Sequence, residues 1–328
     1  MDESLNSASR NRSESMTPPL NRSMTPLEWA LLIVLSTLWG ASFLFVAVQV
    51  TELSAVTIVT VRVVIAALLL AAVLIVMGVR FPRDRLSLRD FLIMGLLNNV
   101  FPFTLIAYGQ SHIPSGLASI LNATAPLFTV VVAHLMTADE KMTPARIAGV
   151  LVGFAGVVVM IGPSALANIG GELLPELACL TAALGYATSA VFARRFSRRG
   201  IPPMAIATGQ MTTASLIMLP VWLLIDQPWT LPVPSLPVIA AVLALAVLST
   251  VVAYILYYRI LATAGSVNLM LVTFLIPVTG ILLGALVLGE RLAPRHFLGM
   301  AAIGIGLACI DGRLIRRAAR LTSARQSG

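Results

Sequence analysis

The sequence predicts an all-α integral membrane protein with ten transmembrane helices, built as two inverted five-helix repeats. Hydrophobic residues make up 58% of the 328 residues and charged residues only 11%, whereas about a quarter of a soluble protein is charged. A chain of this length has room for about ten spans of some 20 residues each. Pro144 and Pro294 lie 150 positions apart, as do Gly149 and Gly299, and such a fixed period indicates an internal duplication.

Ten apolar runs follow one another along the chain, and each is bounded by the proline, glycine or charged residues expected at helix ends. Because backbone polar groups within lipid must be paired inside the protein, these runs are expected to be α-helices. In order, the predicted helices cover residues 29–50, 55–78, 89–109, 114–136, 145–162, 173–194, 204–225, 236–258, 265–288 and 294–312.

The duplication divides the chain into two halves, with a polar segment at each end. We predict the first five-helix half at residues 29–162 and the second at residues 173–312. Residues 1–28 are rich in Ser, Asn, Arg and Pro, and they hold too little apolar surface to offset the entropy of ordering. They are therefore expected to form a disordered cytoplasmic tail, and residues 313–328 a basic cytoplasmic tail.

The distribution of Lys and Arg predicts the orientation of the helices. With ten spans and the amino terminus inside, 19 of the 22 Lys and Arg residues fall on the inner side. Only Arg291 and Arg295 fall on the outer side, and Arg62 lies within a span. By the positive-inside rule, both termini are expected in the cytoplasm of a cell with a bacterial-type inner membrane. Because each half holds an odd number of spans, the second half is inverted relative to the first.

Several short motifs occur in a characteristic order over residues 29–312. They are Leu38-Trp39-Gly40-Ala41-Ser42, Arg62, Ala125-Pro126-Leu127, Glu140, Gly185-Tyr186-Ala187, Ile276-Pro277 and Gly289-Glu290-Arg291-Leu292. In these motifs the chain resembles the drug/metabolite transporter superfamily, and specifically its ten-span EamA-type members. The resemblance implies a ten-helix fold around a central cavity and the movement of small organic solutes by alternating access, commonly outward.

Arg62 is the only charged residue well inside a predicted span. Ionisable side chains are costly within a bilayer, and for that reason they indicate function. Three roles are open: binding a carboxylate of the solute, holding a gate closed, or bracing the bundle through backbone carbonyls. The second half has no arginine at the matching depth, so the sequence favours a gating or structural role.

Six further side chains are predicted to line the substrate cavity. Three are asparagines within apolar runs, where an amide can present its dipole to a solute or pair with a carbonyl that a proline leaves free. A plain hydrogen bond between helices is the alternative. Three are aromatics with one polar edge, which suits an amphipathic solute. The predicted cavity residues are Trp39, Asn98, Asn122, Tyr186, Tyr254 and Asn268.

Two prolines are predicted to lie in helices that move, and four glycines at contacts where helices pack. Pro126 and Pro277 occupy corresponding helices of the two halves, where each is expected to kink its helix. Glycines four positions apart let two helices approach closely. We expect such packing at Gly149 and Gly153 and at Gly280 and Gly284.

The scarcity of charged residues in mid-membrane narrows the predicted class of solute. All Asp and Glu residues fall at span ends or in loops, so a central carboxylate for a proton relay is missing, and uncoupled movement or exchange is favoured. Few Lys or Arg residues lie in mid-membrane to bind a phosphorylated sugar. A small neutral or zwitterionic metabolite, such as an amino acid, is therefore the expected substrate of an exporter. We expect no cofactor, metal or nucleic acid; the partners are the solute and the lipid bilayer, and the oligomeric state is open.

Two other classes of protein remain as alternatives. His134 and Asp139 have the spacing of the HxxxxD motif of membrane acyltransferases, in which the histidine is the base. No phosphate-binding basic cluster accompanies them, and a short motif needs such context. A channel or sensor without turnover is the second alternative.

Overall fold

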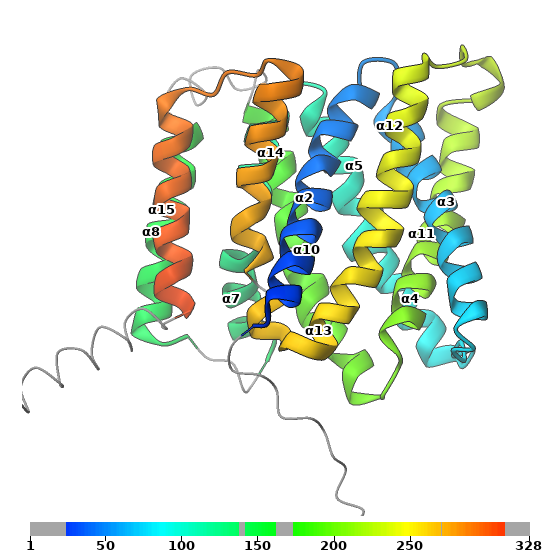
Figure 1. Cartoon of the computed structure of the whole chain (residues 1–328), viewed down its shortest axis with the longest axis horizontal. Helices are drawn as coiled ribbons and strands as arrows, with labels where there is room; N and C mark the ends of the chain where they lie inside the picture. The colour runs from blue at the N-terminus through cyan, green and yellow to red at the C-terminus, as the bar shows by residue number, and fades with distance from the viewer. Residues whose placement is uncertain (1–23, 138–141, 162–172, 270, 312–328) are drawn as a thin grey trace, which may run out of the picture.

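The structure, a computed structural model, describes residues 24–137, 142–161, 173–269 and 271–311, and within these it contains helices and no strand (Figure 1). The helices of the first half are α2 (Pro26–Gln49), α3 (Ala55–Val76), α4 (Arg85–Gly95), η1 (Leu96–Val100), α5 (Phe101–Gln110), α6 (Ser115–Asn122), α7 (Ala125–Met136) and α8 (Pro144–Ile161). Those of the second half are α10 (Leu173–Arg198), α11 (Pro203–Ile225), η2 (Pro228–Thr230), α12 (Leu236–Ala246), η3 (Val247–Val252), α13 (Ala253–Leu269), α14 (Val272–Leu288) and α15 (Pro294–Asp311).

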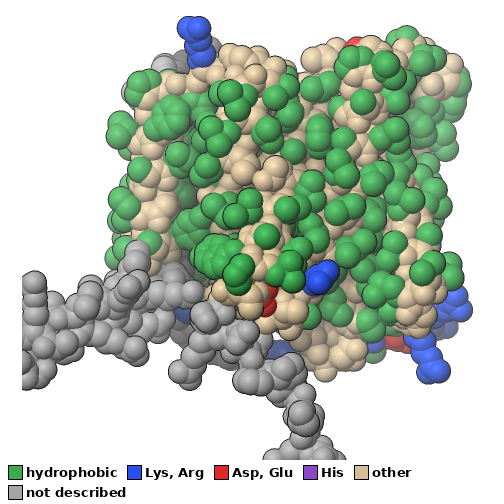
Figure 2. Space-filling view, in the orientation of Figure 1, with side chains coloured by type: hydrophobic (Ala, Val, Ile, Leu, Met, Phe, Trp, Pro, Cys, Tyr) green, Lys and Arg blue, Asp and Glu red, His purple; other side chains and the backbone are tan. Residues whose placement is uncertain are grey.

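The helices have the length and composition of membrane spans, which confirms the predicted all-α membrane fold. Seven stretches are long and apolar enough to cross a bilayer, and two shorter apolar helices, Pro144–Met160 and Val272–Leu288, accompany them. Figure 2 shows hydrophobic side chains over most of the height of one face, with charged side chains toward its two ends. Each of the ten predicted runs corresponds to helix in the structure, whereas the number of membrane crossings stays a prediction.

The two halves run in opposite directions. Asp226, which follows α11, accepts hydrogen bonds from the hydroxyls of Ser54 and Thr57 at the start of α3. The end of α11 therefore lies at the same end of the bundle as the end of α2, and Figure 1 shows both near the top. Because α10 precedes α11, it runs antiparallel to α2, its counterpart in the first half, as an inverted repeat requires.

Helix boundaries differ from the prediction at several places. Helix α2 begins at Pro26, three residues earlier than expected, because Thr25 and Glu28 form a capping box that satisfies backbone N–H groups of the first turn. The predicted helix 265–288 begins at the break in α13 at Gly265, and it is divided, since α13 ends at Leu269 and α14 begins at Val272. The chain bends within α13 at Gly265, whose φ of 78° favours glycine.

The third span of each half contains a short π-helix, a feature that the sequence analysis did not predict. The two π-helices, η1 and η3, begin at Leu96 and Val247, 151 positions apart. Each therefore occupies the same place in its repeat. A π-turn inserts an extra residue into a helix, rotates the side chains that follow, and is frequent at functional sites.

Glycines bring α8 and α15 into close contact at the border of the halves. A methyl group at Gly156 would lie 2.7 Å from the carbonyl oxygen of Gly299, and one at Gly306 would lie 2.8 Å from the backbone nitrogen of Gly153. The carbonyl oxygen of Gly149 also faces Gly306. Backbone therefore packs directly on backbone between these helices, as small residues permit in membranes.

We predict that Gly156→Ala destabilises the protein by about 1–3 kcal/mol, because the added methyl group would force α8 and α15 apart. Gly304→Ala, on the same α15, is the matched control, since no atom lies within 4 Å of the position that its methyl group would take. Thermal denaturation in detergent should show a lower Tm for Gly156→Ala alone. Equal Tm values for the two variants would contradict the packing argument.

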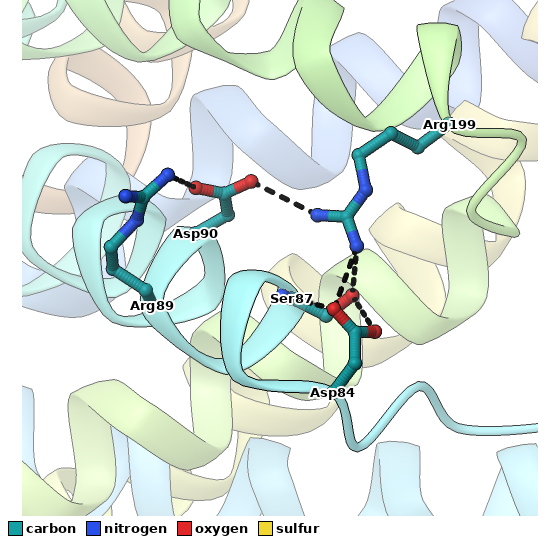
Figure 3. A network of polar contacts seen from close by, with 5 residues as sticks. All are labelled: Asp84, Ser87, Arg89, Asp90 and Arg199. Carbon is teal, nitrogen blue, oxygen red and sulfur yellow. Dashed lines mark hydrogen bonds and ion pairs between the residues drawn. The ribbon is translucent and has the colours of Figure 1, made fainter.

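A group of charged residues, the Arg199 cluster (Asp84, Ser87, Arg89, Asp90 and Arg199), joins the halves at one end of the bundle. Arg199, in the turn after α10, donates to Asp84 at 2.9 Å, to Ser87 at 2.8 Å and to Asp90 at 3.2 Å (Figure 3). Asp84 also caps α4 by accepting from the backbone N–H of Ser87 at 3.0 Å. The turn after α10 in the second half therefore binds the start of the third span of the first half.

Corresponding contacts occur at the opposite end of the bundle. Glu52, in the turn after α2, accepts from the backbone N–H and the hydroxyl of Ser235, the N-cap residue of α12. Ser235 lies 151 positions after Asp84, so the duplicated chain repeats this arrangement with different chemistry. Glu290 adds a second contact there, accepting from the backbone N–H groups of Ser115 at 2.7 Å and Gly116 at 3.0 Å. These are free donors at the start of α6, which favour an anion.

The Arg199 cluster predicts a pH-dependent contribution to stability. Hydrogen bonds from the hydroxyl and backbone N–H of Ser87, together with Arg199, lower the pKa of Asp84 from 3.8 to about 2. A depressed pKa stabilises the fold above the unfolded-state value, and this contribution disappears as the pH falls through the folded-state value. We expect Asp84→Asn to lower Tm at pH 7, and the difference from wild type to shrink below pH 3.8 and vanish near pH 2.

The control for this prediction is Arg85→Gln, which changes an exposed charge in the first turn of the same helix. Its Tm difference from wild type should show no comparable loss between pH 4 and pH 2. A constant difference between Asp84→Asn and wild type over that interval would contradict the assigned role of Asp84.

Candidate functional site

A hydrogen-bonded polar cluster joins the two halves in the middle of the bundle. The Asn98 amide on η1 donates to Gln210 Oε1 on α11 at 3.1 Å and to the Tyr254 hydroxyl on α13 at 3.3 Å. Gln210 Nε2 donates to the same hydroxyl at 3.0 Å. Ser189 on α10 completes the cluster by donating to Asn98 Oδ1 at 2.9 Å. One side chain of the first half thus binds three helices of the second.

Arg62 makes the second connection between the halves. Its Nε donates to Thr250 Oγ1 on η3 at 3.0 Å, while the Thr250 hydroxyl donates to the Leu245 carbonyl oxygen. The guanidinium carbon lies 3.7 Å from the centre of the Phe103 ring on α5, a cation–π contact. Arg62 also interacts electrostatically with Tyr186 and Tyr254. It therefore belongs to the same site as Asn98 and its partners.

The duplication explains how the π-helices build this site. The contact of Asn98 with Ser189 has a counterpart in the contact of Ser249 with Leu38. Ser249 lies 151 positions after Asn98, and Leu38 lies 151 positions before Ser189. Ser249 on η3 donates to the Leu38 carbonyl oxygen on α2 at 2.6 Å. In each half the π-helix thus turns a polar side chain onto the first helix of the other half, which places polar groups at the centre.

Aromatic rings lie beside the polar cluster. The Trp39 and Tyr257 rings have centroids 5.6 Å apart, and those of Tyr257 and Tyr258 are 5.1 Å apart. Tyr258 in turn stacks with Tyr254 at 6.0 Å. Tyr186 packs against both of the large hydrophobic clusters of the bundle. All five side chains are only half-buried, so the rings leave surface that a solute can contact.

The structure brings some of the predicted cavity residues together and leaves others apart. Asn98, Tyr254, Tyr186 and Trp39 lie in or beside the cluster. The described hydrogen bonds do not join Asn122 or Asn268 to it. Asn268 instead donates to the Ala264 carbonyl oxygen of its own helix at 2.9 Å, and Asn122 ends α6. Asn268 therefore pairs within its own helix, while the buried Oδ1 of Asn122 has no hydrogen-bond partner among the described residues.

The predicted kinks and glycine contacts have clear positions. Pro126 is the second residue of α7, just after the chain breaks between α6 and α7, and Pro277 lies inside α14. Next to Pro277, a methyl group at Gly280 would lie 2.7 Å from Ser119 Oγ of α6, and Gly284 faces Ser115 at the start of α6. Gly280 and Gly284 thus lie where α14 crosses the first half.

Sequence reasoning missed Gln210, Thr250 and Ser189, although each lies within an apolar run. A signal was available for Gln210, because an uncharged amide in mid-span is as costly to leave unpaired as that of Asn98. Comparing the halves at a 151-residue offset would have matched Ser189 with Leu38 and Asn98 with Ser249. Hydroxyls and amides, not only charged groups, carry the contacts between the halves.

Asn99 follows Asn98 on η1 and differs from it in its surroundings. Its side chain is fully buried, and neither amide atom has a hydrogen-bond partner among the described residues. An unpaired buried amide usually carries an energetic penalty of about 1–3 kcal/mol. This part of the bundle therefore holds more polar groups than its hydrogen-bond network can pair.

A cavity of about 200 Å³ lies elsewhere, between α6, α14 and α15. Apolar side chains predominate in its lining, and of the predicted residues only Pro277 contributes to it. Among the described residues, no group of three or more His, Cys, Asp or Glu side chains could hold a metal ion. The polar cluster between the halves is thus the candidate functional site.

Many transporters have an all-helical membrane fold of two inverted halves with polar groups gathered between them. A family model described as the EamA-like transporter family matches the chain twice, over residues 27–162 and 173–310. The chain belongs to this family and thus to the drug/metabolite transporter superfamily, as the resemblance in its motifs predicted. It is a multi-pass membrane protein.

Relatives and a solved structure agree with this assignment. An uncharacterized transporter of Archaeoglobus fulgidus is 26% identical over 85% of this chain and 97% of its own length. A probable terminal-alkyne amino-acid exporter of Streptantibioticus cattleyicolor is 26% identical over 88% of this chain and 94% of its own. One crystal structure matches the fold with a TM-score of 0.63 and 21% identity, covering 88% of this chain and 98% of that one.

We predict that Tyr254→Phe destabilises the protein by about 1 kcal/mol, because Gln210 Nε2 loses the oxygen to which it donates. Tyr258→Phe is the matched control, since its ring stacks on Tyr254 but its hydroxyl makes no hydrogen bond within the described structure. Thermal denaturation should show a lower Tm for Tyr254→Phe and the wild-type Tm for Tyr258→Phe. The network has no such role if both variants melt like wild type.

Proposed function

We propose that the protein exports a small neutral or zwitterionic metabolite, such as an amino acid, by alternating access. The polar cluster between the halves is the substrate site, with Trp39, Asn98, Tyr186 and Tyr254 in contact with the solute. The observation that carries the proposal is the Asn98 network, in which one side chain of the first half binds three helices of the second. A site shared by two inverted halves can open to either side when the halves rock against each other.

The contacts at the two ends of the bundle support this mechanism. The Arg199 cluster ties the halves at one end, and the Glu52 and Glu290 contacts tie them at the other. Alternating access requires that contacts at one end form while those at the other end break. Charged groups at the bundle ends can exchange protein partners for water, which makes such switching feasible.

The arrangement of charges supports the proposed location. Arg199, Arg85 and Arg89 lie at the end of the bundle where α2 begins and α15 ends (Figure 1). By the positive-inside rule this end faces the cytoplasm. We therefore propose a bacterial-type inner membrane protein with both termini in the cytoplasm.

Exchange without proton coupling is proposed because no carboxylate contacts the described polar cluster. The two ion-paired aspartates, Asp84 and Asp90, belong to the Arg199 cluster at one bundle end. The relative from Streptantibioticus cattleyicolor is named an amino-acid exporter, which supports both the solute class and the direction proposed here.

The acyltransferase alternative rests on His134 and Asp139. His134 Nδ1 accepts the backbone N–H of Met142 at 3.2 Å, which places that nitrogen in a local helix-end contact. Asp139 lies outside the described residues. Membership of a transporter family favours transport over acyl transfer, and His134→Ala separates the two, since transport should survive this substitution whereas acyl transfer should be lost.

Counterflow of labelled amino acids into proteoliposomes of purified protein tests the proposal. We expect accumulation of one class of solute without an imposed pH gradient, and a loss of about tenfold or more in Trp39→Ala and Asn98→Ala, because both lose contacts at the site. Gly304→Ala, on α15 and beside the separate apolar cavity rather than the polar cluster, is the control and should keep wild-type rates.

Four outcomes would contradict parts of this proposal. Accumulation only with a pH gradient would show proton coupling, and wild-type rates in both site variants would place the substrate elsewhere. A flux of solute without exchange of label across the membrane would indicate a channel. No counterflow for any amino acid would refute the proposed solute class.

A further inference from the structure

We propose that the transported solute carries a carboxylate and that the guanidinium group of Arg62 binds it. The inference rests on the proposed function and narrows its solute class. It assigns Arg62 to the substrate, whereas the sequence alone favoured a gating or structural role.

Arg62 holds an uncompensated positive charge. A guanidinium carries five N–H donors, and only the Nε group has a hydrogen-bond acceptor among the described residues, namely Thr250. Phe103 covers one face of the group. The four N–H groups of Nη1 and Nη2 are left, and their planar fork matches the two oxygens of a carboxylate. Of the described ion pairs, each involves Arg89 or Arg199 and none involves Arg62.

The hydroxyl of Tyr254 supplies a further donor beside this charge. Its oxygen accepts hydrogen bonds from Asn98 Nδ2 and from Gln210 Nε2. Since both partners are amide N–H groups, which only donate, the hydroxyl hydrogen of Tyr254 remains available. Tyr254 lies close enough to Arg62 to interact with its charge. The site therefore offers a cation and a hydroxyl donor, a combination that suits an anionic oxygen.

The described polar cluster offers no carboxylate to pair with an ammonium group. Asn98 Oδ1 already accepts from Ser189, and Gln210 Oε1 accepts from Asn98. A second cation would also be repelled by Arg62. The carboxylate is consequently the recognised group, and an amino group is tolerated rather than required. The nearby Trp39, Tyr257 and Tyr186 rings suit an apolar body on the same solute.

Half-burial of Arg62 is consistent with a role in binding. Thr213, the residue 151 positions later, carries no charge and donates to the Phe91 carbonyl oxygen at 2.8 Å. At the corresponding position of the second half, the hydroxyl of Thr213 is therefore enough to brace the helices. A guanidinium at Arg62 exceeds that need, and its charge requires a partner that the described protein does not supply.

Ligand-induced thermal stabilisation of the purified protein tests the proposal with 3-phenylpropionate, its amide 3-phenylpropionamide, and 3-phenylpropylamine. We expect the acid to stabilise the wild-type protein at concentrations about tenfold to a hundredfold lower than the amide, and the amine to be weakest. Equal effects of acid and amide, including no effect of either, would overturn the proposal. This comparison needs no variant, so a folding defect cannot obscure it.

Arg62→Gln, Arg62→Lys and Thr250→Val separate substrate binding from bracing. We expect Arg62→Gln to abolish the preference for acid over amide and Arg62→Lys to restore part of it, since the charge returns without the planar fork. Thr250→Val removes the brace but keeps the charge, so the preference should persist. If Thr250→Val and Arg62→Gln change acid and amide alike, Arg62 only braces the bundle.

The two proposals can fail separately. Binding of the acid through Arg62 without any counterflow would refute transport and leave the carboxylate site standing. Counterflow of solutes without a carboxylate, unaffected by Arg62→Gln, would refute the carboxylate site and leave transport standing.

Discussion

Polar groups inside a bilayer must find their partners within the protein, because the lipid offers none. In this structure the constraint acts most directly at the two π-helices. Each replaces regular α-helical bonds in the middle of a span, and each turns Asn98 or Ser249 toward the opposite half. The halves are consequently joined by directed hydrogen bonds rather than by apolar contact alone. This arrangement also places the half-buried tyrosines and Arg62 around one site.

Duplication and inversion together explain why contacts occur in related pairs at opposite ends. Asp84 and Ser235 begin equivalent helices, and each is held by the turn that follows the first helix of the other half. The chemistry differs, since an arginine serves one end and a glutamate the other. Backbone topology repeats in such a fold, whereas side chains at the repeated positions are free to diverge.

The repeats also differ in chemistry at the centre, where they face each other. Tyr254 corresponds to Phe103, and the phenyl ring covers Arg62 while the phenol accepts two amides. Arg62 corresponds to Thr213, which pairs with a backbone carbonyl. A two-fold scaffold thus carries a one-sided charge, an asymmetry that suits the proposed binding of a solute with one acidic end.

The sequence by itself determined the class of fold, because hydrophobic length, the period of about 150 residues and the positions of Lys and Arg are properties of the chain alone. It also singled out Asn98, Tyr254 and Trp39, which lie in or beside the polar cluster, since polar and amphipathic side chains in mid-span are costly wherever they lie. Only the tertiary structure decided which of them meet. Gln210, Thr250 and Ser189 lie more than 90 positions from their partners in the first half. The π-turns that carry Asn98 and Thr250 depend on helix packing, which no local pattern encodes.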